Sequence, residues 1–124
     1  YEHHGAVGDQ QLVDSFYVKQ SVTPVNLPNV ERGGIQNHYG YLWWLNGKAS
    51  SMVPQSQIVF PVSLASNAPA DMFMALGKDD KKTYVVPSLD VVVVRLGDDA
   101  GGSVAGPSSF DNDFWGKLKL AMKY

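Results

Sequence analysis

The sequence predicts an α+β domain in which an antiparallel β-sheet meander packs against a C-terminal helix. Three apolar or β-branched runs between residues 70 and 97 are separated by polar or proline-containing turns, a spacing typical of a meander. Residues 108–123 carry apolar side chains at helical spacing. The chain has 124 residues, 44% of them hydrophobic, which is enough for one core.

Composition excludes several classes of protein. The net charge of −2 gives no strong attraction for nucleic acid or an anionic membrane surface, so no nucleic-acid partner is expected. The lack of cysteine excludes disulfides and thiolate metal sites. No apolar run approaches the ~20 residues that a transmembrane helix needs, so no membrane span is expected. No cofactor or metal is expected either, because the adjacent His3 and His4 would point to opposite sides of an extended segment.

The N-terminal part, residues 1–21, is expected to be an irregular lead-in followed by a short helix over about 14–21. Asp14 can accept a hydrogen bond from a free N–H of the first helical turn. The helix should end before Pro24, because proline restricts the residue that precedes it. The stretch 22–38 contains two prolines and two adjacent glycines and is predicted to be a loop.

Residues 39–46 predict a strand that is buried on both faces. One alternating set holds Tyr39, Tyr41, Trp43 and Leu45, and the other holds Gly40, Leu42, Trp44 and Asn46. Large apolar groups in both sets favour a strand with a covering layer on each side. An aromatic core is the favoured role, and stacking of sugars or bases is the alternative. The following stretch, 47–69, contains three prolines and is predicted to be a second loop.

The meander is predicted over residues 70–97. Its first strand is the apolar run 72–76, which ends at Gly77, and its second is the β-rich run 83–86, which stops at Pro87. The third run, 91–96, begins with four consecutive valines and is expected to be a central, buried strand.

The closing helix is predicted over 108–123. Ser108 or Ser109 can cap it, acidic residues occupy its first turn and lysines its last turns, which suits the helix dipole. Its apolar face is expected to lie on the meander and consists of Phe110, Phe114, Trp115, Leu118, Ala121 and Met122.

A search for catalytic motifs finds no self-sufficient active site. No serine has a lysine three residues later, no Gly-x-Ser-x-Gly elbow occurs, and no phosphate-binding loop is present. The pairs 79–80 and 98–99 are interpreted as solvated turn charges. Arg95 could bind an anion, although an ordinary ion pair is favoured. His38 could line a cleft, although a surface position in a loop is favoured.

The order of segments resembles the C-terminal portion of class C-like members of the serine β-lactamase and penicillin-binding-protein superfamily. The resemblance rests on Tyr-Gly-Tyr-x-Trp-Trp at 39–44 and on Val-Pro-x-x-Asp-Val-Val-Val-Val-Arg at 86–95. It implies that 1–124 is a C-terminal fragment or domain of a larger hydrolase with a β-lactamase/transpeptidase-like fold. Such an enzyme transfers an acyl group from an ester or amide to its serine and then to water. A periplasmic or secreted location would fit the resemblance, while the sequence itself leaves the compartment undetermined.

The resemblance also implies which residues take part. The family's Ser-x-x-Lys and Tyr-x-Asn elements lie upstream of this portion and have no match here, so the fragment alone is expected to be inactive. Its Lys/His-x-Gly element would fall at about 72–75, where this sequence has Met72-Phe73-Met74 and the basic residue is lost. The remaining role is a backbone N–H of the oxyanion hole, assigned first to Ala75 with Leu76 or Gly77 as register alternatives. Met74, Leu76, Gly77 and His38 would form the pocket wall.

The resemblance implies two kinds of partner besides a small ester or amide substrate. These are the missing N-terminal part of the same enzyme and a second copy, because an uncovered apolar sheet face is costly in water. The alternative function is a non-catalytic binding module that uses the aromatic strand and the two long loops. A stand-alone structural domain without a ligand is the third hypothesis.

Overall fold

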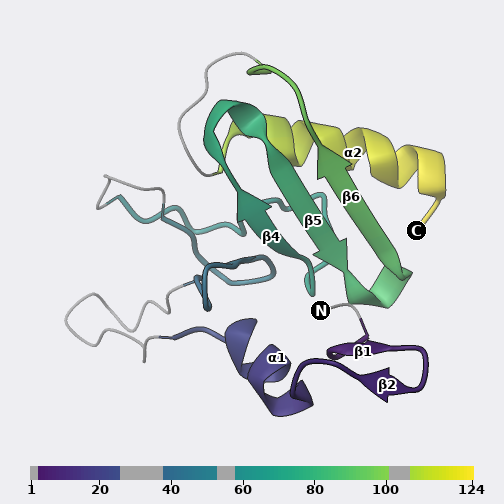
Figure 1. The fold of residues 1–124 in the computed structure, drawn as a ribbon. Helices are drawn as coiled ribbons and strands as arrows, with labels where there is room; N and C mark the ends of the chain where they lie inside the picture. The colour runs from purple at the N-terminus through teal and green to yellow at the C-terminus, as the bar shows by residue number, and fades with distance from the viewer. Residues whose placement is uncertain (1–2, 26–37, 53–57, 101–106) are drawn as a thin grey trace.

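The structure, a computed structural model, describes residues 3–25, 38–52, 58–100 and 107–124. The described chain is α+β, with two antiparallel sheets and a C-terminal helix, which confirms the predicted class (Figure 1). In chain order its strands and helices are β1 (Ala6–Val7), β2 (Gln10–Gln11), α1 (Ser15–Ser21), β3 (Trp44–Leu45), β4 (Phe73–Leu76), the 3-10 turn η2 (Lys78–Asp80), β5 (Lys82–Val86), the 3-10 turn η3 (Pro87–Leu89), β6 (Val91–Arg95) and α2 (Ser109–Met122).

The main sheet has the strand order β3-β4-β5-β6, with every neighbouring pair antiparallel. Strands β4, β5 and β6 form the predicted meander, joined by η2 and η3. At the second turn Asp90 adopts a left-handed conformation with φ 53°, which lets the chain reverse directly after the Pro87 turn. The N-terminal lead-in is more regular than predicted, because β1 and β2 form a small hairpin around Gly8 and Asp9.

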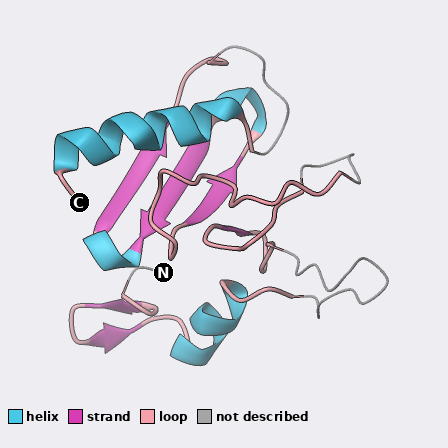
Figure 2. Cartoon of the chain, turned by 180° about the vertical axis from the view of Figure 1, so that it is seen from behind, coloured by secondary structure: helices cyan, strands magenta, loops and turns pink. Residues whose placement is uncertain are grey.

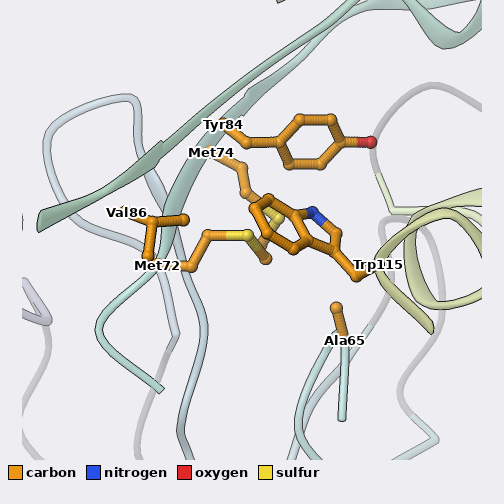
Figure 3. Close-up of a cluster of buried hydrophobic side chains, with 6 residues drawn as sticks. All are labelled: Ala65, Met72, Met74, Tyr84, Val86 and Trp115. Carbon is orange, nitrogen blue, oxygen red and sulfur yellow. The ribbon is translucent and has the colours of Figure 1, made fainter. Parts of the chain in front are cut away.

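Helix α2 lies across one face of the sheet and forms the main core with it (Figure 2). Trp115 of α2 is fully buried and meets the ring of Tyr84 edge-on, with centroids 5.7 Å apart. Figure 3 shows the indole of Trp115 among side chains from β4, β5 and the loop before β4. This core consists of Ala65, Met72, Met74, Tyr84, Val86 and Trp115.

The opposite face of the sheet is only partly covered. At one end Leu45, Phe73 and Val85 form a second buried cluster, against which Val22 and Trp43 pack. The rest of this face is open along β6, whose Val92 and Val94 are 49% and 58% exposed. The prediction of a central buried strand for the valine run was therefore wrong. The run lies at the sheet edge, because no described strand pairs with its outer side.

The predicted strand over 39–46 is also corrected. Only Trp44–Leu45 is a strand, and the chain reverses just before it, with the N–H of Gly40 donating to the carbonyl of Trp43 at 2.8 Å. Leu42 at the tip has φ 64° and is 81% exposed. Gly40 is required because a Cβ there would lie 2.1 Å from the carbonyl oxygen of Ser21. The alternating aromatic residues thus form a tight turn packed on the end of α1.

Both helices begin as their sequences predict. The Asp14 carboxylate accepts the N–H of Tyr17 at 2.9 Å and caps α1. At α2 the N–H of Ser108 donates to Asp111 Oδ2 at 2.7 Å, which ties the cap to the first turn. The apolar face of α2 is shorter than predicted, because Ala121 and Met122 of the last turn are exposed.

The two predicted loops lie partly outside the described residues, which omit 26–37 and 53–57. The described parts of 22–38 and 47–69 contain no helix and no paired strand beyond a single bridge between Ser51 and Phe60. The buried Asn46 side chain holds the second loop. Its Nδ2 donates to the carbonyls of Ala65 and Pro69, both at 2.9 Å, and its Oδ1 accepts from Ser63 Oγ at 2.6 Å.

Within the described ranges, no helix is both long and apolar enough to cross a membrane.

Candidate functional site

The residues predicted for the oxyanion hole lie beside a cavity at the C-terminal end of β4. The cavity has a volume of about 340 Å³, and Ala75, Leu76 and Gly77 form part of its wall. Tyr39, Leu42 and Trp44 of the aromatic turn also line it. The structure therefore brings the end of β4 and the aromatic turn together around one space.

Backbone alternation decides which N–H of β4 can point outward. Asn46 N–H donates to the Met72 carbonyl on the β3 side, and Gly77 N–H donates to the Lys81 carbonyl on the β5 side. Successive residues of a strand direct their backbone groups to alternate edges. The N–H of Ala75 therefore faces β5, where Ala75 pairs with Thr83, and the N–H of Leu76 faces the side of β3.

This outward edge is open at Leu76. The pairing of β3 with β4 stops at Trp44 and Met74. The same register would place Leu42 opposite Leu76, but the chain has already turned there. The geometry favours Leu76, one of the two register alternatives, over Ala75 as an outward donor, and the oxyanion role itself stays a prediction.

Two other predicted wall residues lie elsewhere. Met74 is fully buried in the core beneath α2, since its side chain points to the α2 face of the sheet. His38 is 4% exposed, so the favoured surface position was wrong. Its ring stacks on Trp44 with centroids 5.7 Å apart, and its Nε2–H donates to the Met52 carbonyl at 2.9 Å. Burial lowers the pKa of His38, an effect partly offset by the bond to Met52.

The cavity wall carries the hydroxyls of Tyr39 and Thr83 and the amines of Lys81 and Lys82. It contains no serine, histidine or carboxylate among the described residues. An outward backbone N–H can stabilise developing negative charge on an acyl oxygen. The serine nucleophile that the resemblance implies is not among the residues of this wall.

Sequence reasoning missed a buried ionic cluster around Lys82. The Lys82 ammonium group lies 3.0 Å from Asp80 Oδ1 and 2.9 Å from Asp111 Oδ2, and its side chain has no exposed surface. Ser108 links the two carboxylates, because its Oγ donates to Asp80 at 2.9 Å and its N–H donates to Asp111. The cluster joins β5, the β4–β5 turn and the start of α2.

The surroundings shift the pKa values of Asp80 and Tyr84. Burial alone would raise the pKa of Asp80, but hydrogen bonds from Lys82, Ser108 and the N–H of Ala100, with the charge of Lys82, outweigh it and hold the pKa below its usual range. Burial raises the pKa of Tyr84, and the adjacent Asp111 carboxylate raises it further. Tyr84 therefore stays a neutral donor to Asp111, at 2.7 Å.

The cluster contains a serine within reach of a lysine, but it is built for stability. Lys82 Nζ lies 3.1 Å from Ser108 Oγ, a distance that also suits a nucleophile and its base. Lys82 is ion-paired with two carboxylates, however, and the Ser108 hydroxyl donates to Asp80 rather than to Lys82. We assign the cluster to fastening α2 onto the sheet.

One weak signal for the cluster is present in the sequence. Lys82 alternates with Tyr84 and Val86, which both face the core, so the strand period places Lys82 on the buried face as well. A lysine there needs an acidic partner. The interpretation of Asp79–Asp80 as solvated turn charge holds for Asp79, whose side chain is 39% exposed. It was wrong for Asp80, whose side chain is only 1% exposed.

No protein-family model matches the chain, and neither a curated protein nor a solved structure matches it.

Proposed function

We propose that the chain is the C-terminal part of a serine hydrolase related to β-lactamases and penicillin-binding proteins. In this role it supplies half of the sheet, a wall of the acyl pocket and one backbone donor of the oxyanion hole. The reaction is acyl transfer from a small ester or amide to a serine on the N-terminal part of the same enzyme, followed by hydrolysis. The chain alone has no such activity.

One observation carries the proposal. Beside Leu76 the edge of β4 is unpaired and borders a 340 Å³ cavity, while the strand next to it has turned away. An acyl oxygen placed at this edge would accept the Leu76 N–H without breaking a hydrogen bond of the sheet. A meander with a helix on one face is also what the resemblance implies for this portion.

The open face of the sheet supports the proposed partner. Val92, Val94 and Leu96 are exposed along β6, which is unpaired on its outer side among the described strands. The one charged residue of β6, Arg95, lies at its C-terminal end, and an apolar edge strand without proline invites another strand. The N-terminal part of the enzyme would cover this region, and self-association is the expected behaviour when that part is missing.

The first test is the coding sequence upstream of Tyr1. A Ser-x-x-Lys motif there, followed by Tyr-x-Asn, supports the proposal, and an upstream reading frame without a nucleophile motif contradicts it. The chain by itself should not hydrolyse p-nitrophenyl butyrate. Turnover that co-purifies with the chain through two independent chromatographic steps would also overturn the proposal.

The second test removes the proposed donor from the complete enzyme. Leu76→Pro deletes the N–H at an edge position, where proline breaks no ladder hydrogen bond. We expect kcat for p-nitrophenyl butyrate to fall about 10²- to 10³-fold. The control Leu76→Val keeps the N–H and should keep kcat. Equal activity of the two variants, with equal thermal stability, would exclude Leu76 as the donor.

The exposed tip of the aromatic turn favours a second candidate, a non-catalytic binding module. Tyr41 and Leu42 are 42% and 81% exposed at the tip, next to the cavity that Leu42 lines. Immobilised oligosaccharides are a direct probe for this role. Retention that Tyr41→Ala abolishes, together with an upstream sequence lacking a nucleophile, would favour this candidate over the hydrolase.

A further inference from the structure

A second cavity, of about 360 Å³, lies between the C-terminal end of β6 and the first half of α2. Its volume falls within the range of ~300–1,000 Å³ that is usual for small-molecule sites. Arg95, Phe110 and Phe114 line it, together with Tyr84, Val93 and Leu96. The wall is thus apolar and aromatic with a single cationic group.

The aromatic side chains of this cavity present flat, parallel faces. The rings of Phe110 and Phe114 are stacked, with centroids 5.6 Å apart and an angle of 11° between their planes. The ring of Tyr84 continues the stack at 5.8 Å from Phe114 and 20°. The Arg95 guanidinium lies over Phe110, with its carbon 4.9 Å from the ring centre. A planar apolar group can extend such a stack.

In the part of the chain that the structure describes, no carboxylate neutralises the positive charge of Arg95. Its guanidinium donates to two main-chain oxygens, the carbonyls of Asp80 and Asp98, both at 2.8 Å. Among the described residues no carboxylate lies within ion-pair distance of Arg95, which corrects the favoured ordinary ion pair. The nearby carboxylates of Asp80 and Asp111 are committed to Lys82, and residues 101–106 contain no acidic side chain.

The Arg95 guanidinium has more N–H donors than these two hydrogen bonds use. It has five N–H groups in a planar fork, and the two carbonyl bonds need only two of them. A half-buried cation whose bonds go to neutral oxygens retains its full charge. A carboxylate is the anion that best matches the fork geometry and the partly apolar setting.

We propose that this cavity binds a small aromatic carboxylate, with the carboxylate on Arg95 and the ring against Phe110 and Phe114. The site shares Val94, Arg95 and Leu96 with the wall of the cavity beside Leu76, and differs from it in its aromatic side, which Tyr84, Phe110 and Phe114 form. It does not depend on the proposed hydrolase activity. The ligand class follows from Arg95, which has no acidic partner among the described residues, and from the stacked rings beside it.

Titration of the chain with benzoate tests the proposal, with heteronuclear NMR and calorimetry as readouts. Benzyl alcohol serves as the uncharged ring and acetate as the anion without a ring. We expect a Kd for benzoate at least tenfold lower than for either control, with the largest amide shifts in β6 and the first two turns of α2. Benzoate that binds no better than both controls, or that shifts amides elsewhere, overturns the proposal.

Three variants assign the binding to the cavity. Arg95→Gln should raise the Kd for benzoate at least tenfold, and Phe110→Leu about threefold or more. The matched control Lys117→Gln removes an exposed cation from α2 and should leave the Kd unchanged. If Arg95→Gln fails to fold, as judged by circular dichroism, Phe110→Leu and the benzyl alcohol comparison still decide. Equal effects of Arg95→Gln and Lys117→Gln would reduce the binding to nonspecific charge attraction and contradict the site.

Discussion

The two faces of the main sheet differ in how completely they are covered. Beneath α2, Met72, Met74, Tyr84 and Val86 are all buried, and an ionic cluster fastens the start of the helix. On the other face the coverage stops after Phe73 and Val85, and Val92 and Val94 of β6 remain exposed. The same four strands therefore have one face that is covered and one face that is partly exposed.

This difference separates what stabilises the chain from what it can still bind. Burial of apolar area on the α2 face provides stability within the chain itself. The apolar residues of the other face contribute little until another surface covers them. Substitutions should accordingly be costly on one face and nearly silent on the other, unless a partner is present.

The largest effect is expected from Lys82→Ala on the α2 face. The change leaves the Asp80 and Asp111 carboxylates buried side by side without their cation, and should lower the free energy of unfolding by about 3–5 kcal/mol. Urea denaturation followed by tryptophan fluorescence measures it. Lys81→Ala is the matched control, since its half-exposed pair with Asp79 should contribute less than about 1 kcal/mol. Similar losses for both variants would mean that the cluster does not hold α2.

A direct comparison of the faces uses Met74→Ala and Val94→Ala. The first opens a cavity under α2 and should cost about 2–5 kcal/mol. The second truncates a side chain that is 58% exposed and should change stability by less than about 0.5 kcal/mol. Denaturation midpoints with equal slopes give both values. If the proposed N-terminal part covers this face, Val94→Ala should become costly when that part is present, and a small effect there too would argue against such a partner.

Acid should weaken the fastening of α2 through Asp80. The pKa of Asp80 is lowered in the folded chain, so its stabilising contribution is present above about pH 4 and is lost as the pH falls through the lowered value. Asp80→Asn lacks this contribution. The difference in unfolding free energy between the parent chain and this variant should shrink between pH 5 and pH 2. A difference that stays constant over this range, or an equal pH trend for Asp79→Asn, would contradict the assignment.

The smallest expected effect is a gain in stability at the aromatic turn. Leu42 adopts φ 64°, a conformation that costs an ordinary residue about 1–2 kcal/mol, and its side chain is 81% exposed. Leu42→Gly removes this strain and should stabilise the chain by about 0.5–1 kcal/mol, visible as a higher Tm. A loss of stability would show that the exposed leucine packs against the cavity wall more than its burial suggests.

The parts of the fold that local rules determine were predictable from the sequence. Asp14 caps α1, the paired turns define the meander, and the spacing of Phe114, Trp115 and Leu118 defines the face of α2. In each case the residues that decide the structure are close together in the chain. Capping and periodicity therefore contain enough information.

The errors arose where distant contacts decide. The alternating pattern at 39–46 is compatible both with a continuous strand and with the observed turn. The close approach of Gly40 to Ser21 and the left-handed conformation of Leu42 reverse the chain. The valine run lacks any local mark of whether a fifth strand will join it. Likewise, Asp80 is buried only because Lys82 and Asp111, from β5 and α2, meet it there.

For the candidate site, the sequence located the strand end but not the register. The resemblance pointed to 75–77, and the structure places all three residues at one cavity. The choice between neighbouring N–H groups depends on the hydrogen bonds of Asn46 and Gly77, which alternate along β4. Pairing register is a property of the assembled sheet and has no signal within a single strand.

The hydrogen bonds that fix Asn46 to the following loop affect how fast Asn46 can deamidate. Asn46 and Gly47 form the only Asn-Gly pair in the sequence, a dipeptide that deamidates when the glycine nitrogen attacks the side-chain amide carbon. In the folded chain the amide is fixed by Ala65 and Ser63, and the N–H of Gly47 donates to Ser63 Oγ at 2.9 Å. Attack therefore requires unfolding of this loop. The rate of deamidation at Asn46, monitored by mass spectrometry over weeks, therefore reports how often the loop opens.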